Sequence, residues 1–202
     1  SVLISTPKLV FFIFLFFLPQ QFGPHFWPFF SYVHGIRVDY LSPSIYISDI
    51  LILLLFLLSF RDVFTSRLAR KLFSSKLLIL FLFVIFVPLF FTKSPLALLY
   101  GVLKLFEAGF IGLFIATQIK KTDLPQIIGV LAFSGFLESI LSVAQFFKQE
   151  SIGGILYFFG ERLYNLSTIG IAVINTSSGL MVRPYGTFPH PNVLAFFLFT
   201  VT

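Results

Sequence analysis

Two stretches decide the fold: LALLYGVLKLFEAGFIGLFIATQI (residues 96–119) and LPQIIGVLAFSGFLESILSVAQFF (residues 124–147). At a rise of about 1.5 Å per residue, a helix over either stretch is ~36 Å long and crosses the ~30 Å hydrocarbon core of a bilayer. Only the polar residues 120–123 (KKTD) separate the two stretches. The sequence therefore predicts two neighbouring transmembrane helices with a short connection.

The whole chain has the composition of a membrane protein. Its 202 residues are 57% hydrophobic and only 11% charged, whereas a soluble domain carries about 25% charged residues. The interior of a soluble fold of this length is too small to bury so much apolar surface, but a bilayer solvates it. The chain has no cysteine, which excludes a disulfide, a thiol nucleophile and a thiolate metal site.

Further apolar runs predict an all-α, polytopic membrane protein, with residues 1–202 in one membrane domain. We expect five complete transmembrane helices and the start of a sixth. The predicted spans are about 2–18, 45–60, 77–91, 96–119, 124–147 and 192–202, and the predicted outer loops are 19–44 and 148–191. Because the chain starts at Ser1 and stops inside an apolar run, we expect it to be part of a longer protein. A cleaved signal peptide over residues 1–31 is the alternative for the first span.

Local patterns predict the structure at the edges of these spans. Ser48 or Asp49 is expected to cap a helix over Ile50–Phe60. Alternating apolar residues in 36–40 predict a short extended piece. Residues 169–174 (IGIAVI) are too short to span a bilayer, and we expect them to form a helix that lies on its surface.

Basic residues predict the orientation of the chain. The segment 61–76, RDVFTSRLARKLFSSK, has five basic residues and one acidic residue. Cytoplasmic loops carry an excess of Lys and Arg, so we place 61–76 and 120–123 inside and the two longer loops outside. The formal net charge of +6 then reflects topology and anionic lipid headgroups, and we expect membrane lipids rather than nucleic acid as partners.

The segment RPYGTFPHPN (residues 183–192) is the clearest candidate site. Its three prolines and one glycine predict a fixed, non-helical turn where the outer loop re-enters the membrane. Such a turn would hold Arg183, His190 and Asn192 near the headgroups, with the N-terminal amides of the next helix pointing at the same place. A guanidinium binds phosphate oxygens through two parallel hydrogen bonds, so the group suits a polyprenyl diphosphate. The alternative is structural: helix caps, and an arginine that reaches bulk lipid phosphate.

The same segment resembles a known family. RPYGTFPHPNVLAFFL (183–198) is similar to the Arg-x-x-Gly-Thr-Phe-x-x-Pro-Asn signature of the O-antigen ligase/polymerase-related family. GIRVDYLSPSIYISDILILLL (35–55) is similar to the first outer loop and second span of that family, and SIGGILYFFGERLYN (151–165) to the loop before the signature. The resemblance covers nearly the whole chain.

The resemblance implies a multi-pass glycosyltransferase of the bacterial inner (cytoplasmic) membrane, in lipopolysaccharide or polysaccharide biosynthesis. It implies transfer of a glycan from undecaprenyl diphosphate to a hydroxyl acceptor, on a glycan or a lipid, at the outer face and without cofactor or metal. The signature arginine, here Arg183, would bind the diphosphate. Members of the family also need a histidine in a later outer loop. The catalytic histidine is therefore expected beyond residue 202, and His190 is not given that role.

Five further charged residues are candidates. Arg37 and Asp39 lie two apart on an extended stretch and share a face, where they bind acceptor or diphosphate or pair with each other. Lys104 and Glu107 lie three apart within a span and are expected to neutralise each other. Glu138 is a lone intramembrane acid, which serves either function or a hydrogen-bonded contact between helices.

Two other functions stay open. A metal-dependent glycosyltransferase acting on polyprenyl-phosphate sugars would use an acid in the first outer loop, and Asp39 is available. Asp39 has no second carboxylate nearby in the sequence to complete a divalent-ion site. Neither His25 nor His34 has a carboxylate or a second histidine at the spacing of metal ligands. A non-enzymatic lipid-glycan transporter would use the polar residues within the spans as a path.

Glu161 and Arg162 are expected to form a solvated or headgroup-bound pair.

Overall fold

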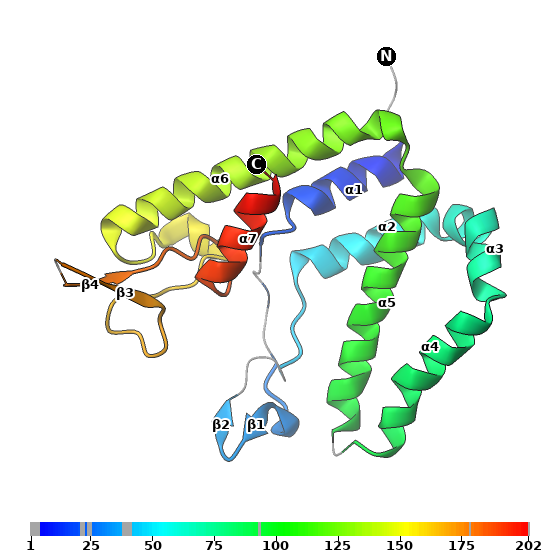
Figure 1. The fold of residues 1–202 in the computed structure, drawn as a ribbon, viewed down its shortest axis with the longest axis horizontal. Coiled ribbons are helices and arrows are strands. Elements are labelled where there is room, and N and C mark those ends of the chain that lie inside the picture. The colour runs from blue at the N-terminus through cyan, green and yellow to red at the C-terminus, as the bar shows by residue number, and fades with distance from the viewer. Residues whose placement is uncertain are drawn as a thin grey trace. The chain divides into compact units, whose positions relative to one another are not determined.

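The computed structural model of this chain describes residues 5–20, 23, 26–37, 42–92, 94–177 and 179–201. These residues are mostly helical (Figure 1). The α-helices are α1 (Thr6–Phe16), α2 (Ile47–Phe64), α3 (Arg67–Phe73), α4 (Lys76–Phe86), α5 (Pro95–Gln118), α6 (Leu124–Lys148) and α7 (Pro191–Val201). The 3-10 turns are η1 (Phe29–Ser31), η3 (Val87–Phe90), η4 (Lys121–Asp123) and η5 (Gly154–Phe159). The antiparallel hairpins are β1 (Tyr32–Val33) with β2 (Ile36–Arg37), and β3 (Val173–Thr176) with β4 (Gly179–Val182).

Two of the described helices are long and apolar enough to cross a bilayer. They are α5, with 24 residues, and the continuous helix of η4 and α6, Lys121–Lys148, with 28 residues. They coincide with the two stretches that decide the fold. The prediction of a mostly helical protein is therefore confirmed, and two of its described helices have the length and composition that crossing a bilayer requires.

The other helices lie within or close to the remaining predicted spans but do not meet the same criteria singly. α1 and α7 have 11 residues each, and α2 has 18 residues that include three charged side chains, Asp49, Arg61 and Asp62. Arg67–Phe73 and Leu78–Phe90 meet the criteria only together, with a bend of 59° between them. The number of five complete spans stays a prediction.

The described residues divide into two compact units. Unit 1 contains the β1–β2 hairpin, most of α2, and α3 to α5; in it, Phe56 of α2 packs edge-on against Phe110 of α5, with ring centroids 5.1 Å apart. Unit 2 contains most of α1, α6, α7 and the segment between the last two helices. Its small cores are Tyr164 with Val182 and Tyr185, and Phe188 with Leu194 and Phe197.

Two local predictions are wrong. The helix expected from Ile50 begins at Ile47, so neither Ser48 nor Asp49 precedes it as a cap. Residues 169–174 do not form a surface helix, because Val173 and Ile174 enter the β3–β4 hairpin, opposite Val182 and Met181. Pairing of β-branched residues across the strands outweighs the weak helical preference of so short a segment.

The extended piece in the first outer loop is present where the structure describes it. Val33 pairs with Ile36 in the β1–β2 hairpin. The two turn residues, His34 and Gly35, have φ angles of 51° and 79°, as a tight two-residue hairpin turn requires. Residues 38–41 lie outside the described residues.

Candidate functional site

A stripe of polar side chains on α6 organises the candidate site. Its members within the helix are Ser134, Glu138, Ser142 and Gln145, which are all buried, and Gln149, the half-buried residue directly after the last helical residue, follows them. At 3.6 residues per turn the four helical positions fall within an arc of about 80°. One face of an otherwise apolar helix therefore offers hydrogen bonds to the segments packed against it.

Gln145 holds the backbone of the turn at residues 183–192. Its Oε1 accepts hydrogen bonds from the amides of Tyr185 (3.0 Å) and Gly186 (2.8 Å), and its Nε2 donates to the Gly186 carbonyl (3.1 Å). The Nε2 donates a fourth bond to Glu161 Oε1 (2.8 Å), so every donor and acceptor of this amide is used. Because Gln145 is only 1% exposed, these bonds replace all of its contacts with water.

Glu138 and Gln149 extend the same contact in both directions. Glu138 Oε1 lies 2.6 Å from Thr187 Oγ1, and its Oε2 accepts from the Thr187 amide (3.0 Å). One helical repeat beyond Gln145, Gln149 Oε1 accepts from the Val182 amide (2.8 Å). Two side chains of α6, Glu138 and Gln145, and the residue that caps its end, Gln149, are thus hydrogen-bonded to the backbone from 182 to 187. Of the two roles considered for Glu138, the structure has the hydrogen-bonded contact, made to the turn rather than to another helix.

Gly186 is required for this approach. A Cβ atom at this position would collide with Glu138 Oε2 and would lie 3.2 Å from Leu194 Cδ1. Its φ of +58° also lies in the left-handed region that side chains with a Cβ avoid. Two separate physical reasons therefore favour glycine at position 186: the space against Glu138 and Leu194, and the left-handed backbone.

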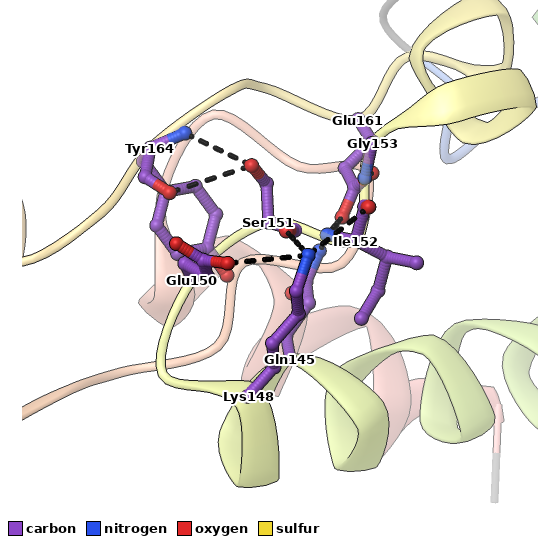
Figure 2. Close-up of polar contacts among 8 residues, drawn as sticks. All are labelled: Gln145, Lys148, Glu150, Ser151, Ile152, Gly153, Glu161 and Tyr164. Carbon is purple, nitrogen blue, oxygen red and sulfur yellow. Dashed lines mark hydrogen bonds and ion pairs between the residues drawn. The ribbon is translucent and has the colours of Figure 1, made fainter.

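Glu161 organises the segment that leaves α6, and the prediction that it is solvated is wrong. Its Oε1 accepts from the Ile152 amide (2.6 Å) as well as from Gln145, and its Oε2 accepts from the Gly153 amide (2.7 Å) (Figure 2). The residue is 2% exposed. Three N–H donors replace the water that a carboxylate normally requires, while the neighbouring Arg162 is exposed as expected.

The segment after α6 is closed by further backbone bonds. The Ser151 amide donates to the Tyr164 carbonyl (3.0 Å). Ser151 Oγ accepts from the Tyr164 amide (3.2 Å) and donates to the Tyr164 carbonyl (3.4 Å) (Figure 2). The Tyr164 ring packs on Tyr185, with centroids 5.0 Å apart, and burial raises the pKa of the Tyr164 phenol. The segment 151–165 and the turn 183–192, which are well separated in the sequence, therefore form one hydrogen-bonded structure.

The structure brings together the three residues predicted to bind substrate in this turn. Arg183 Nη2 donates to Asn192 Oδ1 (2.8 Å), and the Asn192 amide donates to His190 Nδ1 (3.2 Å). His190 and Asn192 are exposed and Arg183 is half-buried. The guanidinium is thus held at the start of α7, and among the described residues its one hydrogen-bond partner is Asn192, which leaves other N–H groups for a ligand.

The expectation that α7 offers free N-terminal amides is wrong. Pro191, the first helical residue, has no N–H. The Asn192 amide is bonded to His190 Nδ1, and the amides of Val193 and Leu194 both donate to the His190 carbonyl (3.0 and 3.3 Å). The helix start therefore contributes its dipole rather than open donors, and Arg183 is the cationic donor of this turn.

The other predicted candidates lie in unit 1. Arg37 is in β2, and its role in substrate binding stays a prediction. Asp39 and His25 lie outside the described residues, and His34 occupies the hairpin turn. Within the described part of the chain, no three His, Asp or Glu side chains are grouped so that they could hold a metal ion.

Lys104 is paired as predicted, but with one more partner. Its Nζ lies 3.2 Å from Glu107 Oε2 and 2.6 Å from Asp49 Oδ2 of α2. The Lys104, Asp49 and Glu107 side chains are 29%, 14% and 19% exposed. Asp49 is therefore an ion-pair partner between α2 and α5, and not the helix cap suggested by its position in the sequence.

Sequence reasoning missed Gln145, Gln149 and Glu161. The signal for the α6 stripe was present, because polar residues recur at helical spacing through an apolar stretch from Ser134 to Gln149. No comparable pattern marks Glu161, whose partners come from residues 145, 152 and 153.

Comparisons with known proteins add no family assignment. A scan against protein-family models found no match, and searches of the curated proteins and of the solved structures found none.

Proposed function

We propose that this chain belongs to a membrane glycosyltransferase of the O-antigen ligase or polymerase type. In this proposal it transfers a glycan from undecaprenyl diphosphate to a hydroxyl acceptor, on a glycan or a lipid, at the outer face of the bacterial inner membrane. The signature-like sequence of residues 183–192 suggests the family, and two helices that are long and apolar enough to cross a membrane are compatible with it. The observation that carries the proposal is the guanidinium of Arg183, held by Asn192 at the start of α7.

The geometry of the turn suits an arginine whose guanidinium must be held in a fixed orientation toward a ligand. Its backbone is bonded to Gln145, Glu138 and Gln149, so the position of Arg183 does not depend on a flexible loop. One guanidinium nitrogen is bonded to Asn192, which orients the plane of the group. A planar fork so oriented can bind two diphosphate oxygens at once, which a lysine cannot do.

The chemistry that we propose is an inverting displacement. The acceptor oxygen forms a bond to the anomeric carbon while the bond from that carbon to the diphosphate oxygen breaks. The leaving undecaprenyl diphosphate gains negative charge, and Arg183 together with the positive end of the α7 dipole stabilises it. The acceptor proton passes to a general base, for which this turn supplies no assigned residue.

A non-enzymatic lipid-glycan transporter is the second candidate, favoured by one observation. Charged residues placed within apolar helices commonly line transport paths, and Lys104, Asp49 and Glu107 form such a group on α5 and α2. Glu138 belongs to unit 2, where it is bonded to Thr187. The argument for transport therefore depends on unit 1 alone.

The test is Arg183→Lys in the complete membrane protein, with Arg162→Lys as the matched control in the same outer segment. Loss of a charged, oriented hydrogen bond costs about 1.5–3 kcal/mol, which is about a ten- to hundredfold lower rate. We expect this loss for Arg183→Lys and a change within about twofold for Arg162→Lys, whose side chain is exposed.

The assay is conversion of lipid-linked glycan to product in membranes at matched protein level. Near-normal transfer by Arg183→Lys would remove Arg183 from the site and refute the proposal. Transport without glycan joining would favour the transporter.

A further inference from the structure

Glu138 is a buried acid with an unusual set of partners. The residue is 6% exposed, and its carboxyl group contacts the side chain and the amide of Thr187. Within the described residues it makes no ion pair. An ionised carboxylate in this position would be buried with two neutral hydrogen bonds as its compensation, which is costly.

The hydrogen atoms around Thr187 can be counted. Thr187 Oγ1 carries one hydrogen, yet it lies 2.6 Å from Glu138 Oε1 and 3.1 Å from the carbonyl oxygen of Pro19. A carboxylate and a carbonyl are both acceptors only, so one hydrogen cannot make a linear hydrogen bond to both. If Glu138 carries a proton on Oε1, it donates to Thr187 Oγ1, which then donates to Pro19. The Thr187 amide donates to Oε2, and every group is satisfied.

We propose that Glu138 is a neutral carboxylic acid that positions the turn carrying Arg183, by donating to Thr187 and by accepting from its amide. The carboxyl group thereby connects three segments distant in sequence: the end of the α1 region at Pro19, the α6 stripe and the Gly186–Thr187 turn. Glu138 is a positioning residue, since it acts on a ligand only through the turn. Its link to glycan transfer rests on the proposed function, whereas its protonation does not.

Glu161 provides an internal contrast. Both of its oxygens accept from nitrogen donors, the Ile152 and Gly153 amides and Gln145 Nε2. A glutamine at 161 would place an NH₂ group against an N–H donor. A glutamine at 138 would instead supply one donor to Thr187 Oγ1 and one acceptor to the Thr187 amide, which is the pattern of the neutral acid. The same chemical substitution should therefore have opposite outcomes at the two positions.

The experiment compares Glu138→Gln, Glu138→Ala and Glu161→Gln in the complete protein. We expect glycan transfer by Glu138→Gln to stay within about threefold of the parent, and both other variants to lose at least tenfold at matched protein level. We also expect Glu138→Gln to have the same midpoint detergent concentration of unfolding as the parent protein. Glu138→Ala and Glu161→Gln should unfold at lower detergent concentrations. A Glu138→Gln protein that fails to fold, or that behaves as Glu138→Ala does, would overturn the proposal.

Infrared spectroscopy reads the proton directly. The parent-minus-Glu138→Gln difference spectrum should contain the C=O stretch of a carboxylic acid, which shifts in D₂O. It should contain no carboxylate bands of comparable size. Carboxylate bands in its place would refute the neutral acid, whatever the activity. If the parent protein does not transfer glycan, the proposed function fails, while infrared and unfolding measurements still decide the state of Glu138.

Discussion

Replacing Gly186 by alanine tests whether α6 and the turn are in contact as closely as the structure has them. The new Cβ would meet Glu138 Oε2, lie 3.2 Å from Leu194 Cδ1 and 3.5 Å from Ser142 Oγ. Relief of this overlap requires the Glu138 carboxyl group to leave its position or the turn to move away from α6. Such a movement stretches the bonds from Glu138 to Thr187 and from Gln145 to residues 185 and 186.

The magnitude has two parts. A left-handed backbone costs an alanine about 1–2 kcal/mol relative to glycine. Overpacking of a well-packed site costs a further ~1–3 kcal/mol. We therefore expect Gly186→Ala to lower the free energy of unfolding by about 2–5 kcal/mol.

Gly170→Ala is the matched control. Gly170 lies in the same outer segment and has a φ of +78°, but a Cβ there would have no atom within 4 Å. It therefore isolates the backbone part, and we expect a loss of only about 1–2 kcal/mol. The measurement is equilibrium unfolding of the purified protein by sodium dodecyl sulfate in mixed micelles. Equal losses for Gly186→Ala and Gly170→Ala would show that the turn does not pack against Glu138, and would refute the site geometry.

Two further predictions concern topology and the charged group of unit 1. Single cysteines at Ser74 and Ser177 should differ in labelling by an impermeant thiol reagent in intact spheroplasts: Ser177→Cys is expected to react and Ser74→Cys to be protected, and the reverse pattern would invert the proposed orientation. Lys104→Met leaves the Asp49 and Glu107 carboxylates without their shared cation. It should destabilise the protein in mixed micelles by somewhat less than the ~3–5 kcal/mol of a fully buried pair, because the Lys104 side chain is 29% exposed. Lys121→Met, at an exposed position in η4, is the control and should leave the free energy of unfolding unchanged.

Much of the local structure was predictable because it depends on neighbours in sequence. Apolar runs of more than 20 residues require a bilayer-length helix in any context, and α5 and α6 follow the predicted ranges to within a residue or two. The non-helical turn before α7 follows equally from three prolines and a glycine, each of which restricts or permits particular backbone angles by its own covalent structure.

The roles of individual polar residues were not predictable in this way. Asp49 was expected to cap a helix and pairs instead with Lys104, 55 positions later. Glu161 was expected in water and is enclosed by residues 145, 152 and 153. In each case the environment of the side chain is made by a segment whose approach no local pattern encodes.

The amino-acid pattern was sufficient to predict a mostly helical chain with two helices long and apolar enough to cross a membrane, and a proline-rich turn that carries Arg183, His190 and Asn192. Only folding brings this turn onto Glu138, Gln145 and Gln149, where Gly186 allows a close approach because it has no Cβ. The physical reason is the range of the interactions. Hydrophobic periodicity and backbone restriction act within a few residues, whereas a buried hydrogen bond acquires its meaning from a partner that folding brings from 40 or 49 positions away.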